Sequence, residues 1–147
     1  MTSFSIHNFG CRVNQAEAFC WSSEFQRHGL RLEKEIGRSE LVLINTCTLT
    51  SRADRDVRKF IRKVTRLNPQ VKLIITGCSV EQQYKEFQGI PQVWHLFPNR
   101  EKSYLTEKVL SLIAPQKESS ILPYRSRALL KIQDGCNFME FQALIFL

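Results

Sequence analysis

The run Leu41-Val42-Leu43-Ile44 places four apolar residues in succession. A strand with one solvated face alternates apolar and polar residues, whereas a strand covered on both faces is a continuous apolar run. Three more short stretches, at residues 4–9, 71–76 and 93–97, have a similar apolar character. These four stretches predict buried strands of a mainly parallel sheet.

Amphipathic helical patterns separate the predicted strands. The first covers about residues 14–28, with Gly29 as its stop, and the second covers about residues 51–67. The third begins at Ser79, and the fourth covers about residues 100–113. The apolar positions expected to face the core are Ala18, Trp21 and Phe25, then Val57, Phe60, Ile61 and Val64, then Val80, Tyr84 and Phe87, and finally Leu105, Val109 and Leu112. Strands that alternate with helices predict an α/β fold, an open sheet flanked by helices in the Rossmann or flavodoxin manner.

The composition changes after this domain, which we assign to residues 1–114. Residues 115–127 contain two prolines and adjacent serines, which indicate a linker. Residues 128–133 have the pattern of a new strand, so we assign residues 128–147 to the start of a second domain.

The chain is basic, with 21 Lys and Arg against 14 Asp and Glu and a formal net charge of +7. This balance suits a polyanionic partner. Part of the charge forms a stripe on the second predicted helix, made of Arg52, Arg55, Lys59, Arg62 and Arg66. The stripe is compatible with an ordinary solvated helix surface or with a surface that faces a nucleic acid.

No apolar run approaches the roughly 20 residues that a membrane-spanning helix needs. The first residues lack the basic start and the apolar stretch of a secretory signal. We therefore expect a cytoplasmic protein with no membrane partner, in which cysteines remain reduced.

Three cysteines recur at equivalent positions. Cys11, Cys47 and Cys78 each follow a predicted strand and are separated by 36 and then 31 residues. The carboxyl ends of parallel strands lie at one edge, where open α/β sheets bind their ligands. Gly10 and Gly77 precede two of these cysteines and would allow close backbone approach. The three sulfurs are therefore expected to converge.

Three thiolates could hold a [4Fe–4S] cluster with one open iron position, or zinc with a water as fourth ligand. Three small, buried and inert cysteines are the alternative. Cys20 lies away from the apolar face of its helix, so we expect it to be an ordinary thiol. The three histidines, His7, His28 and His95, have no metal-binding spacing.

Residues 10–15 (GCRVNQ), 44–48 (INTCT) and 76–78 (TGC) resemble the three cysteine motifs of the N-terminal domain of radical-SAM methylthiotransferases. Residues 131–137 (KIQDGCN) resemble the entry to the radical-SAM domain of that family. The residues around the first two cysteines are most similar to those of the subgroup that acts on threonylcarbamoyladenosine in tRNA.

The resemblance implies an enzyme with two iron–sulfur clusters. Cys11, Cys47 and Cys78 would hold an auxiliary [4Fe–4S] cluster connected with sulfur supply. A second cluster, held by Cys-x3-Cys-x2-Cys, would bind and reductively cleave S-adenosylmethionine. The product would carry a methylthio group on C2 of the modified adenosine next to the anticodon. The implied partner is the tRNA anticodon loop, with no obligate protein partner.

The sequence departs from this pattern at the second cluster. Cys136 matches the first ligand, but Glu140 and Ala143 occupy the positions of the other two. A carboxylate and a methyl group cannot replace thiolates. We therefore expect a C-terminally truncated or frameshifted family member, with a single strand of the radical-SAM barrel and no activity of its own. The alternative is a stand-alone iron–sulfur or zinc-binding α/β module. A flavodoxin-like nucleotide-binding domain is less well supported, because no phosphate-cradling loop follows the first strand.

Overall fold

The computed structural model describes residues 2–10, 12–47 and 51–113. Its elements, in chain order, are β1 (Ser3–Phe9), α1 (Arg12–Arg27), β2 (Arg31–Leu32), the 3-10 helix η1 (Ile36–Arg38), β3 (Leu41–Thr46), α2 (Ser51–Leu67), β4 (Lys72–Gly77), α3 (Cys78–Gln88), β5 (Val93–Phe97), the 3-10 helix η2 (Asn99–Tyr104) and α4 (Leu105–Leu112). The predicted linker and the strand at 128–133 lie outside these residues.

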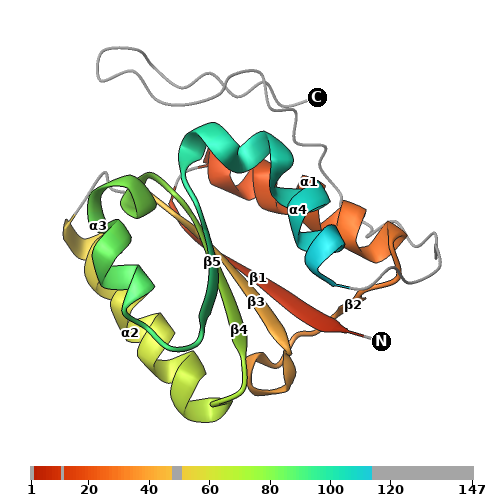
Figure 1. Cartoon of the computed structure of the whole chain (residues 1–147), viewed down its shortest axis with the longest axis horizontal. Helices are drawn as coiled ribbons and strands as arrows, with labels where there is room; N and C mark the ends of the chain where they lie inside the picture. The colour runs from red at the N-terminus through yellow and green to blue at the C-terminus, as the bar shows by residue number, and fades with distance from the viewer. Residues whose placement is uncertain (1, 11, 48–50, 114–147) are drawn as a thin grey trace.

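The five described strands form one sheet in the order β2-β1-β3-β4-β5, and every pairing is parallel (Figure 1). This order is that of flavodoxin-type folds, with its switch point between β1 and β3. The predicted α/β fold with a mainly parallel sheet is therefore confirmed. The edge strand β2 was not predicted, because its two residues are exposed and form no apolar run.

Three strands end at the same level. Phe9 of β1 pairs with Thr46 of β3, and Thr46 pairs with Gly77 of β4. Each is the last residue of its strand. The chain therefore leaves β1, β3 and β4 at one carboxyl edge, which positions the candidate site.

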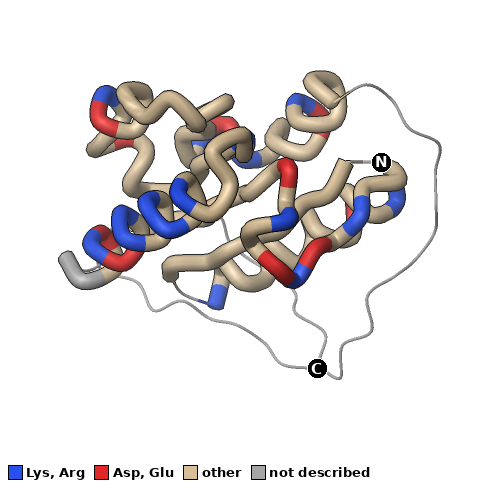
Figure 2. Tube along the Cα trace, turned by 90° about the horizontal axis from the view of Figure 1, so that it is seen from below, with Lys and Arg blue, Asp and Glu red and all other residues tan. Residues whose placement is uncertain are grey.

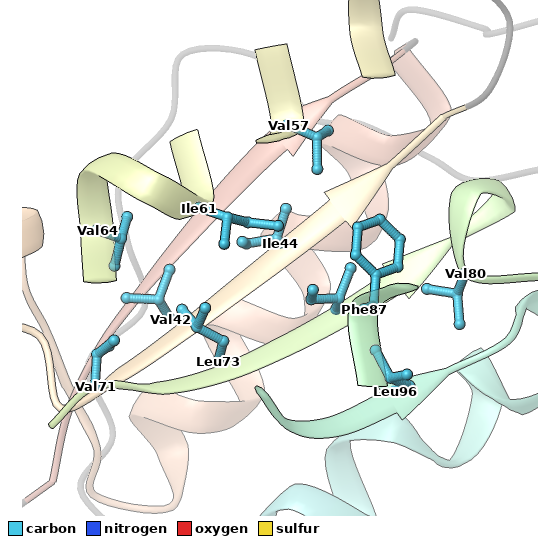
Figure 3. Close-up of a cluster of buried hydrophobic side chains, with 11 residues drawn as sticks. Val42, Ile44, Val57, Ile61, Val64, Val71, Leu73, Val80, Phe87 and Leu96 are labelled. Carbon is cyan, nitrogen blue, oxygen red and sulfur yellow. The ribbon is translucent and has the colours of Figure 1, made fainter. Parts of the chain in front are cut away.

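One face of the sheet packs against α2 and α3 (Figure 1). Its core consists of Val42, Ile44, Val57, Ile61, Val64, Val71, Leu73, Ile75, Val80, Phe87 and Leu96 (Figure 3). Full burial of one such aliphatic or aromatic side chain contributes about 1.5–3 kcal/mol. The predicted apolar face of residues 51–67 is confirmed, with Phe60 only partly buried.

The opposite face packs against α1 and α4. Trp21 and Phe25 of α1 are buried there, and the Phe25 ring meets Phe4 of β1 edge to face at 5.2 Å. Because β3 supplies Val42 and Ile44 to one face and Leu41 and Leu43 to the other, its run is continuously apolar.

Helix α1 ends as its glycine predicts. Gly29 has φ +82°, its N–H donates to the carbonyl of Gln26 at 3.0 Å, and Leu30 N–H donates to the carbonyl of Phe25 at 3.0 Å. This pair of hydrogen bonds is the Schellman arrangement, which glycine accommodates without steric strain.

In the described ranges, no helix combines the length and apolar character needed to cross a bilayer.

Two residues predicted to be buried are exposed. Tyr84 is 44% exposed, and α3 kinks one residue earlier at Gln83, so the helix no longer presents Tyr84 to the core below Val80. Leu112, the last residue of α4, is 40% exposed. Leu110 and Ile113 pack against the core in its place. The first part of the predicted fourth helix is the 3-10 helix η2, and α4 ends at Leu112 because Ile113 is extended, with φ −101° and ψ +115°.

Candidate metal centre at the carboxyl edge of the sheet

Two of the three predicted metal ligands lie at the carboxyl edge of the sheet. Cys47 follows β3 directly and is buried, and Cys78 follows β4 and opens α3, half-buried. Because β3 and β4 are paired neighbours that end level, the two cysteines leave strands about 4.8 Å apart. Cys11 lies outside the described residues.

The residue before Cys11 nevertheless touches the site. A Cβ atom on Gly10 would lie 2.7 Å from Cβ of Cys47 and 2.9 Å from Nδ2 of Asn14. Both distances are too short for any side chain, so the backbone of Gly10 packs directly on Cys47. The close approach predicted for this glycine is present.

Gly77 fixes how the chain turns from β4 into α3. It has φ +107° and ψ −172°, a region that essentially glycine alone occupies. An added Cβ would lie 2.1 Å from the carbonyl oxygen of Thr46. Gly77 therefore allows β4 to stay paired with β3 while Cys78 starts a helix at the edge.

A side-chain amide points at one of the sulfurs. Nδ2 of Asn99, the first residue of η2, donates to Sγ of Cys78 at 3.1 Å. A sulfur that accepts an N–H hydrogen bond is suited to carry negative charge, and such bonds tune the reduction potentials of iron–sulfur clusters. Cys20, by contrast, is exposed on α1, as expected for an ordinary thiol.

Buried polar side chains form the floor beneath the cysteines. Asn14 Nδ2 donates to the carbonyl of Thr46 at 3.2 Å, and Asn45 Nδ2 donates to the carbonyl of Asn14 at 3.2 Å. Thr46 Oγ1 donates to the carbonyl of Thr76 at 2.7 Å, and Thr76 Oγ1 donates to that of Phe97 at 2.9 Å. The two threonine bonds join the carboxyl ends of β3, β4 and β5, and the two asparagine bonds connect α1 to the end of β3.

A buried ion pair connects this floor to η2. Lys102 Nζ donates to Oε2 of Glu17 at 2.8 Å, and Asn45 Nδ2 donates to the same oxygen at 2.9 Å. The side chains of Lys102 and Glu17 are only 12% and 6% exposed. The segment that carries Asn99 is therefore held at the edge through Lys102.

We expect Lys102→Met to destabilise the domain by about 3–5 kcal/mol, because it removes the cation that pairs with the buried Glu17 carboxylate. Urea denaturation would measure the loss. Glu17→Gln combined with Lys102→Met should recover most of it, since the buried charge is then removed as well. Lys108→Met, at an exposed position of α4, should change the free energy of unfolding by less than about 0.5 kcal/mol. A loss at Lys102 no larger than that at Lys108 would contradict the buried pair.

This polar network was not predicted from the sequence. Asn45, Thr46 and Thr76 are polar residues at the ends of otherwise apolar strands, all fully buried. Buried polar groups require hydrogen-bond partners, so polar residues in these positions were a usable signal. Glu17 and Lys102 are 85 residues apart in the sequence and carried no such signal.

The residues present fit a thiolate-bound metal centre. Two cysteines at adjacent strand ends, an amide donor to one sulfur and a glycine that contacts the other are compatible with such a centre. Among the described residues, no group of three or more His, Cys, Asp or Glu side chains could hold a metal ion. The predicted third ligand, Cys11, is not one of those residues, so the ligand set stays a prediction.

The strand order and the cysteine edge define a class of protein: a flavodoxin-type α/β domain with a candidate thiolate metal centre. The chain belongs to the family described as uncharacterized protein family UPF0004, which matches residues 3–97.

The chain is also similar to proteins named threonylcarbamoyladenosine tRNA methylthiotransferase MtaB. It is 35% identical to that of Chlamydia pneumoniae over 139 residues, which cover 92% of this chain and 33% of the relative. It is 32% identical to that of Rickettsia prowazekii over 144 residues, 90% of this chain and 32% of the relative. It is 29% identical to that of Bacillus subtilis over 158 aligned positions, 93% of this chain and 34% of the relative. The chain thus spans about a third of the length of these relatives, and the predicted family is confirmed.

Proposed function

We propose that this chain is the N-terminal part of a tRNA methylthiotransferase, and that Cys11, Cys47 and Cys78 bind an auxiliary [4Fe–4S] cluster. The observation that carries the proposal is the level ending of β1, β3 and β4, which brings Cys47, Cys78 and the residue before Cys11 to one edge. The similarity to relatives named methylthiotransferase supports the same reading. A cluster bound there would supply sulfur-transfer chemistry.

The residues around the edge have separate roles in this proposal. The three cysteines would hold the metal centre, and Asn99 would stabilise negative charge on Sγ of Cys78. Gly10 and Gly77 allow the backbone to approach closely enough, and the ion pair of Lys102 with Glu17 holds η2 against the edge.

The substrate we propose is N6-threonylcarbamoyladenosine next to the anticodon of tRNA, with a methylthio group added to its C2. The names of the relatives and the residues around the cysteines support this choice over other modified adenosines. The reaction would take place in the cytoplasm, with S-adenosylmethionine as second cofactor. Residues 115–127 would link the described domain to the radical-SAM segment at 128–147.

Anaerobic reconstitution with iron and sulfide tests the metal centre. We expect about four iron atoms per chain and broad visible absorption, as a [4Fe–4S] cluster requires. Zinc binding without visible absorption would instead support a module that holds zinc.

We expect the reconstituted chain to produce no 5′-deoxyadenosine from S-adenosylmethionine and reductant. Cleavage requires an iron presented by three thiolates with one open position, and Cys136 is followed by Glu140 and Ala143 at the other two ligand positions. Liquid chromatography of the quenched reaction measures the product. Stoichiometric 5′-deoxyadenosine that disappears in Cys136→Ala would show that this cysteine still supports a catalytic cluster.

A further inference from the structure

A row of cations lies along the outer side of α2. Figure 2 shows the Lys and Arg positions following this helix. Arg55, Lys59, Arg62, Lys63 and Arg66 are all exposed. Four of them are spaced by four, three and four residues, so they share one helical face over about 17 Å. Arg52, the first residue of the predicted stripe, lies outside the described side chains.

These five cations lack the described carboxylate partners that several other basic residues of the domain have. None of the five side chains forms an ion pair or hydrogen bond with a described residue. Six other basic residues, of which Arg58 also lies on α2, do have carboxylate partners: Arg27 with Glu24, Arg31 with Glu33, Arg38 with Glu35, Arg58 with Glu86, Arg100 with Glu101 and Lys102 with Glu17. From Val57 to its end, α2 contains no acidic residue. The five cations of the row are therefore available to an external anion. They differ from Lys34, Lys85 and Lys108, which also lack a described carboxylate partner, in lying together on one helix.

The chemistry of this face indicates repeated phosphates. A helix that binds a membrane surface needs apolar side chains to insert, but the apolar face of α2 is already buried against the sheet. The core of a protein interface is depleted of charged residues and is anchored by aromatic side chains, whereas the outer face of α2 is a row of Arg and Lys. A nucleic-acid backbone offers a line of anions to such a row.

We infer that the outer face of α2 binds the phosphate backbone of the RNA substrate; the identity of that RNA rests on the proposed function. The helix begins four residues after Cys47, so the row starts near the cysteine edge and extends away from it. RNA phosphates held along α2 would continue toward the candidate metal centre. Contacts of this kind position a substrate without reading its sequence.

Two triple variants of the full chain test this inference. The first, Lys59→Gln with Arg62→Gln and Arg66→Gln, removes three charges from the row. The matched control, Lys34→Gln with Lys85→Gln and Lys108→Gln, removes three exposed charges from other elements, and no ion pair is formed by these lysines with a described residue. Fluorescence anisotropy with a labelled anticodon stem-loop RNA measures affinity at several salt concentrations.

We expect the α2 variant to bind this RNA at least about tenfold more weakly at low salt, and its salt slope to fall by about 2, as for three lost phosphate contacts. The control should lose less than about threefold, because it lowers only the overall charge. Equal losses in both variants would overturn the inference. The inference would also be overturned if the three α2 substitutions weakened binding to phosphatidylserine vesicles or to polyglutamate but left RNA binding unchanged.

Iron binding distinguishes this inference from the proposed metal centre. The α2 variant should bind as much iron as the unmodified chain, since its substitutions are remote from the cysteines. RNA binding that depends on α2 in a chain that takes up no iron would sustain the surface and reject the cluster. Normal iron uptake together with equal RNA affinity in both triple variants would support the metal centre and reject the RNA-binding surface.

Discussion

Replacing Cys47 or Cys78 by alanine is expected to reduce bound iron after anaerobic reconstitution from about four atoms per chain to less than about one. Each change removes one of the three proposed thiolate ligands, and no other described cysteine lies at the carboxyl edge of the sheet. Cys11→Ala should have the same effect if the predicted ligand set is complete. Iron analysis and visible absorption measure the result.

Cys20→Ala provides the matched control, because Cys20 is a free, exposed thiol on α1. It should retain the iron content and the absorption of the unmodified chain. Far-UV circular dichroism of each variant shows whether a loss of iron follows from a loss of structure. Full iron uptake by a folded Cys47→Ala chain, or an equal loss in Cys20→Ala, would mean that the ligand set is wrong.

Gly77→Ala is expected to destabilise the domain by about 3–5 kcal/mol. Alanine at φ +107° is strained, and its Cβ would overlap the backbone oxygen of Thr46, 2.1 Å away. Relief would require β3 and β4 to separate where Thr46 and Gly77 pair. Urea denaturation should show the loss as a lower midpoint with little change in slope.

Gly37→Ala tests whether any added methyl group would have this effect. Its Cβ would meet only Cβ of Leu67 at 3.8 Å, an ordinary contact, and its φ is not in the left-handed region. The expected change is within about 0.5 kcal/mol. A Gly77→Ala chain as stable as Gly37→Ala would contradict the geometry of the β4–α3 turn.

Much of the fold was predictable because the sheet is buried on both faces. The strands predicted at 41–44 and 71–76 correspond to β3 (Leu41–Thr46) and β4 (Lys72–Gly77), in which every residue but Lys72 is buried. Two-sided burial produces continuous apolar runs, which are the clearest strand signal in a single sequence. Strand β2 has neither burial nor an apolar run, because it lies at the sheet edge and has only two residues.

Side-chain burial near the ends of helices was less predictable. Tyr84 and Leu112 occupy helical positions that a regular period assigns to the core. The kink at Gln83 breaks that period in α3, and α4 ends at Leu112, where the next residue, Ile113, is extended. Local spacing does not predict where a helix kinks or ends.

At the candidate site, the positions of the cysteines and glycines could be predicted from the sequence, whereas their hydrogen-bond partners could not. The strand–helix repeat predicted that Cys47 and Cys78 share an edge, since parallel strands end together. The hydrogen bond from Asn99 to Cys78 joins residues 21 apart on different elements. It requires the β5–η2 connection to fold back over α3, which no short sequence pattern encodes.

The all-parallel sheet also determines how the chain can fold. Its strand pairings join Ser3 with Arg31, Phe4 with Leu41, and Leu41 with Lys72, residues 28, 37 and 31 apart in the sequence. No hairpin can form early, so long loops must close before any strand pairing stabilises them, and folding is slow. The carboxyl edge exists only once β1, β3 and β4 are all in place. A cluster bound there would link three units distant in sequence and would slow their separation during unfolding.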